Sequence, residues 1–65
     1  MNKIVSIVKN HIVASGPVSF KAVAAYVAEQ STVPVEDWQI AGILNGLLGA
    51  GIISLYDDGV SFTAA

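Results

Sequence analysis

Two proline-containing breaks, at Gly16-Pro17 and at Val33-Pro34, limit what this chain can fold into. A proline inside a helix removes a hydrogen bond and clashes with the preceding turn, so helices stop at such breaks. The segments between and after the breaks carry apolar residues at intervals of three and four, which is the spacing of one helix face. We therefore expect three helices, at residues 2–15, 19–30 and 35–50.

Residues at the breaks also indicate how these helices begin and end. We expect Gly16 to end the first helix as a left-handed cap. Ser19 is expected to cap the second helix, after a short extended link at Val18. Pro34 suits the first turn of the third helix, and Gly51 is expected to terminate it.

After the third predicted helix the pattern changes to alternation, which predicts a hairpin at residues 52–63. The predicted inward residues are Ile53, Leu55, Val60 and Phe62, the predicted outward residues are Ser54, Tyr56, Ser61 and Thr63, and the predicted turn is Asp57-Asp58-Gly59. The expected fold class is mainly α with a small β-hairpin, in the order α-α-α-β-β. We expect residues 1–65 to form a single domain, with a short extended segment after the first helix.

The composition of the chain limits the kinds of site and the cellular location that it can have. A chain of 65 residues buries only about 60% of its unfolded surface, so most of its apolar side chains must share one core. With no cysteine and one histidine it has no disulfide and no cysteine-based metal site. We expect no metal, no cofactor and a reducing, cytoplasmic location. The apolar run after Lys3 is interrupted at Ser6 and Lys9, which does not fit an export signal.

No group of residues in the sequence indicates a catalytic reaction. His11 has no second histidine and no carboxylate one helical turn away, so we expect a capping or solvated side chain. The acid pairs Glu36-Asp37 and Asp57-Asp58 have structural reasons to stand at a helix start and in a tight turn. We therefore expect that the protein is not an enzyme and has no catalytic residues.

The end of the third predicted helix and the hairpin resemble the winged-helix branch of the helix-turn-helix superfamily. The resemblance is carried by the run Leu47-Leu48-Gly49-Ala50-Gly51-Ile52-Ile53 and by the Asp58-Gly59 turn. In that family an apolar pair ends the third helix, a glycine breaks it, an isoleucine starts the wing, and a glycine lies at the wing tip. The resemblance implies a three-helix winged-helix domain. Its DNA-binding members place the third helix in the major groove, and the second helix and the wing on phosphates.

The charges of this chain differ from those of DNA-binding winged helices. Its net charge is −2, it has no arginine, and its bases are Lys3, Lys9 and Lys21. The positions that would face DNA hold Glu36, Asp37 and Gln39 in the third helix and Asp57, Asp58 and Gly59 in the wing. Lys21 is the residue that matches a phosphate contact. Acids that face phosphates repel them, so this departure favours a protein partner over DNA.

We therefore predict a small acidic protein-binding module. It would be a regulatory or accessory factor on a larger machine such as the transcription apparatus, of a kind often seen among phage and plasmid proteins. The partner is expected to be another protein or a second copy of the chain. The predicted partner-binding residues are Glu36, Asp37, Gln39, Gly42, Asn45, Gly46, Tyr56, Asp57 and Asp58.

Two features of the third predicted helix each have two possible explanations. Its glycines, Gly42, Gly46 and Gly49, serve either the close approach of another chain or tight packing against the first helix or the wing. Trp38 is either an interface anchor or a half-buried residue at the rim of the core.

Two alternative functions also stay open. A dimeric DNA-binding transcriptional regulator would gather the three lysines of two copies on one face. A small membrane protein would use residues 38–56 as its span, because they carry no charge and include a G-x-x-x-G spacing. The lack of flanking bases and the alternation of the hairpin argue against the membrane.

Overall fold

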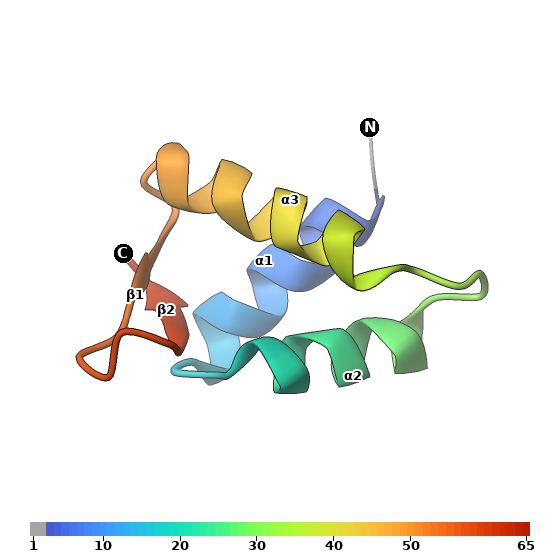
Figure 1. Cartoon of the computed structure of the whole chain (residues 1–65), viewed down its shortest axis with the longest axis horizontal. Coiled ribbons are helices and arrows are strands. Elements are labelled where there is room, and N and C mark those ends of the chain that lie inside the picture. The colour runs from blue at the N-terminus through green and yellow to red at the C-terminus, as the bar shows by residue number, and fades with distance from the viewer. Residues whose placement is uncertain (1–2) are drawn as a thin grey trace.

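The computed structural model describes residues 3–65 and contains three helices followed by two antiparallel strands, as predicted. The elements are α1 (Lys3–Ser15), α2 (Phe20–Gln30), α3 (Asp37–Gly49), β1 (Ile53–Leu55) and β2 (Phe62–Ala64). The expected first residue of the first helix, Asn2, lies outside the described residues. In Figure 1, α3 and α2 run along opposite sides of the molecule, α1 lies behind them, and the two strands lie at one end.

The first helix is the element around which the others pack. Many of its residues are β-branched, which lowers intrinsic helix propensity, so tertiary packing has to hold it. Val8 and Ile12 are fully buried, and α1 packs against α2, α3 and both strands. The core consists of Val8, Ile12, Val23, Val27, Ile40, Leu44, Leu47, Ile53 and Phe62.

The observed start of α2 agrees with the start predicted from the sequence, whereas the observed start of α3 does not. The Ser19 hydroxyl accepts a hydrogen bond from the Ala22 N–H at 3.1 Å, which confirms the predicted cap. The predicted start of α3 at residue 35 is wrong, because the helix begins at Asp37 and Glu36 is its N-cap. The Glu36 N–H donates to Gln39 Oε1 at 2.8 Å, as in a capping box. This local bond fixes the helix start, and Pro34 lies in the linker.

Gly16 does end α1, but not as a left-handed cap. The glycines with positive φ are Gly51 and Gly59, so the prediction for Gly16 is wrong. Its N–H donates to the Ile12 carbonyl at 2.8 Å. A Cβ on Gly16 would lie 2.7 Å from the Ile12 oxygen and 3.0 Å from the Phe62 oxygen. The missing side chain therefore allows the end of α1 to approach β2 closely.

The extended link after α1 is part of the sheet. Val18 and Phe62 exchange two backbone hydrogen bonds, of 2.9 Å and 2.7 Å, and this bridge confirms the predicted extended segment. On the other side of β2, β1 pairs in the register Ile53↔Ala64, Ser54↔Thr63 and Leu55↔Phe62. Gly51, at φ +76°, follows the end of α3 and turns the chain toward β1, as predicted for a terminator.

The strands cover fewer residues than the predicted hairpin of residues 52–63, although β2 continues to Ala64, beyond the predicted end, and two expected inward residues are exposed. Val60 is 67% exposed, because it belongs to the turn and not to the ladder. The Asp58 carboxylate accepts the N–H groups of Val60 at 2.9 Å and Ser61 at 2.8 Å, which holds this turn. Leu55 pairs with Phe62 but is 51% exposed, because the space between it and α3 stays open.

Residues 38–56 do not form one helix, since α3 ends at Gly49 and β1 begins at Ile53. Within residues 3–65, no helix combines the length and the apolar character needed to cross a membrane.

Candidate functional site

The two sides of α3 differ in what they contact. Ile40, Leu44 and Leu47 point inward and are buried in the core. At 3.6 residues per turn, a second set of residues falls on the opposite side of the helix. This set is Trp38, Gly42, Asn45, Gly46 and Gly49, all of them exposed, and we call it the outer ridge.

Trp38 is the most exposed large apolar side chain of the outer ridge. Its exposed fraction is 73%, so the reading of a half-buried residue at the rim of the core is wrong. Tryptophan is expensive to leave in water and is enriched among residues that dominate binding energies. The exposure of Trp38 favours the reading as an interface anchor.

The glycines of the outer ridge do not serve packing within this chain. A Cβ placed on Gly42, Gly46 or Gly49 would meet no atom within 4 Å. The expected alternative, tight packing against the first helix or the wing, is therefore wrong. Gly42 and Gly46 lie inside the helix and cost roughly 1 kcal/mol each relative to alanine. Gly49 is the last residue of α3, where the cost is smaller.

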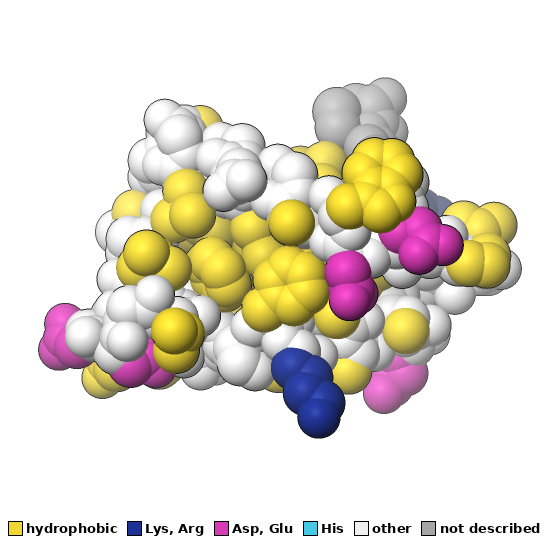
Figure 2. Space-filling model, viewed as in Figure 1, with side chains coloured by type: hydrophobic (Ala, Val, Ile, Leu, Met, Phe, Trp, Pro, Cys, Tyr) yellow, Lys and Arg dark blue, Asp and Glu magenta, His cyan; other side chains and the backbone are white. Residues whose placement is uncertain are grey.

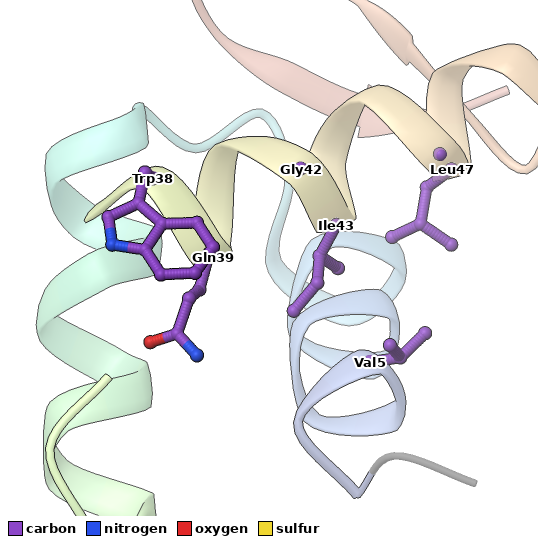
Figure 3. A pocket seen from close by; sticks show the side chains of 7 residues that line it. Val5, Trp38, Gln39, Gly42, Ile43 and Leu47 are labelled. Atoms are coloured by element: carbon purple, nitrogen blue, oxygen red, sulfur yellow. The ribbon is translucent and has the colours of Figure 1, made fainter. Parts of the chain in front are cut away.

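A groove of about 620 Å³ lies between α3 and α1, and we call it the α1–α3 groove. In Figure 3, Trp38 and Gln39 lie at one end, Leu47 lies toward the other, and Val5 of α1 lies below Ile43 and Leu47. The lining residues are Val5, Trp38, Gln39, Gly42, Ile43, Gly46 and Leu47. None of them is charged, so this side of α3 offers shape and apolar contact but no ionic recognition.

A second groove, of about 270 Å³, lies on the other side of α3, next to the start of α2 and the strands. We call it the hairpin groove. Its lining residues are Phe20, Ala41, Leu44, Asn45, Leu48, Leu55 and Phe62. Figure 2 shows hydrophobic side chains gathered over the centre of the molecule and acidic side chains on both sides of this apolar area.

Acidic residues mark the surroundings of the hairpin groove. Asp37 is exposed and precedes Ala41 of the groove by one helical turn on the same side of α3. Asp57 and Asp58 are exposed in the turn that follows Leu55. Ser61 donates its hydroxyl hydrogen to the Asp58 carboxylate at 2.7 Å, and with the backbone N–H groups of Ser61 and Val60 it lowers the pKa of Asp58.

The structure divides the predicted partner-binding residues between the two sides of α3. Gln39, Gly42 and Gly46 line the α1–α3 groove, and Asn45 lines the hairpin groove. Glu36 and Asp37 stand at the start of α3, whereas Tyr56, Asp57 and Asp58 are exposed at the end of β1 and in the turn. These residues therefore do not form one continuous site.

Several groove residues were not predicted as partner-binding residues. Besides the buried core residues Leu44, Leu47 and Phe62, they are Val5, Phe20, Trp38, Ala41, Ile43, Leu48 and Leu55. A helical signal was present for two of them, since Trp38 is on the side of the glycines and Leu48 is on the side of Ala41 and Asn45. Phe20 and Leu55 join the groove through tertiary packing, which has no periodic signal.

The one histidine takes part in packing between helices. The rings of His11 in α1 and Tyr26 in α2 are stacked, with centroids 4.0 Å apart and planes 8° apart. The expectation of a capping or solvated side chain is therefore wrong, because the His11 ring is half-buried against an aromatic neighbour. Among the described residues, no three His, Cys, Asp or Glu side chains are grouped so that they could hold a metal ion.

No protein-family model, no curated protein and no solved structure matches this chain. The features of the molecule that bear on its function are therefore the two grooves, the outer ridge and the positions of the charges.

Proposed function

We propose that this chain is a protein-binding module of the winged-helix type. It acts as a small cytoplasmic accessory factor on a larger assembly, and it neither catalyses a reaction nor reads DNA. The observation that carries this proposal is the hairpin groove, an apolar depression that has three acids, Asp37, Asp57 and Asp58, and one base, Lys21, in its surroundings. In DNA-binding winged helices the corresponding face, between the third helix and the wing, lies against the duplex.

The charges near this groove disfavour a nucleic acid. Binding to a duplex gains free energy when lysines or arginines displace the counterions of the phosphates. Asp37, Asp57 and Asp58 would repel phosphates instead, and Lys21 beside Phe20 is a single base against them. Apart from Asn45 the lining is apolar, so it offers a phosphate backbone one amide and no base.

A polypeptide with an apolar centre and basic flanks fits this face best. Its apolar side chains would be removed from water against Phe20, Leu48 and Leu55, which is the favourable term for a groove of this kind. Lysine or arginine on either side of that centre would meet Asp37 and the aspartates of the turn. Complementary charges raise the association rate and make it sensitive to salt.

The experiment that tests the proposal is a titration of 15N-labelled protein, followed by amide chemical shifts. The probe is an amphipathic helical peptide of leucine and lysine, and the matched control peptide has glutamate in place of lysine. We expect the lysine peptide to shift the amides of Phe20, Ala41, Leu48 and Leu55, and salt to weaken it. Equal binding of both peptides, or shifts confined to other elements, would contradict the proposal.

Variants of the chain make the same test more specific. Replacing two of the three acids near the groove, in Asp37→Asn/Asp57→Asn, is expected to weaken the binding of the lysine peptide several-fold, mainly through the association rate. The matched control is Glu29→Gln, which removes an exposed acid near the end of α2. If the control weakens the peptide as much as the double variant, net charge and not the groove explains the binding.

Duplex DNA is the probe for the alternative function. At low salt we expect no shift of random duplex in a gel. A shift with a clear salt dependence that is lost in Lys21→Glu would replace this proposal by the DNA-binding alternative.

A further inference from the structure

The outer ridge of α3 carries a large residue at one end and small residues at the other. Trp38 is in the first turn and is mostly exposed, while Gly46 and Gly49 in the last turns leave open space above the helix. A ridge of this shape is complementary to itself when it is turned end for end. The bulk at the start of one helix then meets the space at the end of the other.

We propose that a second copy of this chain docks on the outer ridge, with the two α3 helices antiparallel about a two-fold axis. Trp38 of each copy lies over Gly46 and Gly49 of the other and fills the free part of its α1–α3 groove. A two-fold contact uses the same patch on both copies, so one complementary ridge suffices for both halves of the interface. This surface differs from the hairpin groove and does not depend on the function proposed for it.

The lack of charge on this surface fits a second copy as its occupant. Neither the α1–α3 groove nor the outer ridge contains a charged residue, so a basic partner gains no ion pair there. A second copy brings an equally uncharged ridge, and no charge on the ridge is buried. Antiparallel helices also place Glu36 and Asp37 of the two copies at opposite ends, whereas parallel helices would bring these acids together.

The glycines allow the two α3 helices of the proposed dimer to approach each other closely. Helix axes pack 8–10 Å apart, at a separation that depends on the side chains at the contact. Gly42 and Gly46 remove those side chains, which lets a second backbone approach and lets Trp38 lie flat over it. Contacts made only in the dimer thus offset a helix cost that the single chain leaves uncompensated.

The area available sets the expected strength. A standard interface takes about 800 Å² from each partner, which is roughly a fifth of the 4094 Å² surface of this chain. A ridge one helix wide does not supply this area alone, so the contact has to include Val5 and Ile43 on the groove walls. We expect a reversible dimer in the micromolar range and not a permanent one.

The first experiment is sedimentation equilibrium of the full chain from low micromolar to near-millimolar concentration. We expect a monomer–dimer equilibrium that Trp38→Ala weakens roughly thirtyfold, because the substitution removes the largest apolar side chain of the interface from both copies. Gly46→Ala is expected to weaken it about tenfold, because the added methyl group separates the helices. The matched control, Val60→Ala, truncates a similarly exposed apolar side chain in the hairpin turn and should leave the equilibrium unchanged.

Folding is followed in the same samples by circular dichroism, so that loss of the dimer is separated from loss of structure. Gly46→Ala should be at least as stable as the original chain, because its Cβ meets nothing. A chain that stays monomeric at the highest concentration would overturn the proposal. So would a dimer that is insensitive to Trp38→Ala and Gly46→Ala, since the contact would then lie elsewhere.

The orientation is tested with a spin label, which the absence of cysteine in this chain makes selective. Ala50→Cys carries the label next to the end of α3, and it is mixed with unlabelled 15N-enriched protein. Antiparallel helices predict broadening of the Trp38 indole N–H of the enriched copy. Stronger broadening at Gly49 than at Trp38 would indicate parallel helices and overturn the arrangement. The outcome of the peptide titration has no bearing on these results, so the two proposals fail separately.

Discussion

The inner and outer sides of α3 show two uses of one short helix. On the inner side, Ile40, Leu44 and Leu47 are almost completely buried and their neighbours fill the space around them. On the outer side, Trp38 is exposed and the glycines have open space above them. The inner side is explained by the fold of this chain. The outer side costs helix stability and exposes an aromatic ring, which the contact proposed above with a second copy would account for.

The largest expected effect is the difference in stability between substitutions at two nearby positions of α3, Ile40 on the inner side and Trp38 on the outer side. Ile40→Ala should lower the free energy of unfolding by about 2–5 kcal/mol, because it opens a cavity in the core. Trp38→Ala should change it by less than about 0.5 kcal/mol in dilute solution, since the side chain is mostly in water. Urea unfolding of both variants measures the difference, and similar losses would contradict the assignment of the two sides.

A second prediction compares glycines in different surroundings. Gly16→Ala should destabilise the fold by about 1–3 kcal/mol, because the new methyl group would press on backbone atoms of Ile12 and β2, which cannot move independently. The readout is the urea midpoint at unchanged slope. A neutral Gly16→Ala would show that the approach of α1 to β2 is not as close as the structure has it.

The same substitution on the outer ridge should have the opposite sign. Gly42→Ala and Gly46→Ala are each expected to raise the free energy of unfolding by up to about 1 kcal/mol, through helix propensity alone. The measurement is made at concentrations where the chain is monomeric, because a dimer adds its own concentration-dependent stability. If either variant destabilises the dilute protein, the ridge packs within the chain after all.

The smallest effect concerns the turn of the hairpin and its pH dependence. Hydrogen bonds from Ser61 and Val60 lower the pKa of Asp58, so its contribution to stability is present above the ordinary aspartate range. This contribution is lost as the pH falls through the lowered pKa. The amide shifts of Val60 and Ser61 should follow this titration, and in Asp58→Ala they should be displaced and independent of it. Unchanged shifts in the variant would contradict the hydrogen bonds.

Local signals in the sequence were sufficient for much of the fold. The three helices, the Ser19 cap and the Asp57-Asp58-Gly59 turn follow from spacing and from side chains that bond to nearby backbone. The start of α3 was misplaced, because Pro34 is a permissive signal for a helix start whereas the Glu36–Gln39 bond is a decisive one. Gly16 was misread because its environment is made by Phe62, a residue far away in the sequence.

The candidate site was less predictable than the fold. Helical spacing places Trp38 on the same side of α3 as the glycines. Apolar residues occur around most of this helix, however, so the sequence did not show which side is buried and which is exposed. Gly42 and Gly46 have open space above them because α1 and the strands lie elsewhere. The positions of those elements cannot be predicted from the spacing of residues within α3. The hairpin groove joins four elements, α2, α3, β1 and β2, so Phe20 and Leu55 meet there only after the chain has folded.

The bridge between Val18 and Phe62 has a consequence for how the protein is made. Both backbone groups of Val18 bond to a residue that the ribosome adds only after α2, α3 and β1. While the chain grows, the junction between α1 and α2 therefore has no strand to pair with, and Gly16 lacks the backbone of β2 against which it packs. Forming such a distant pair costs loop-closure entropy, which is recovered only when the core assembles around it. We expect the nascent chain to acquire its structure in one late step, after Phe62 has left the exit tunnel.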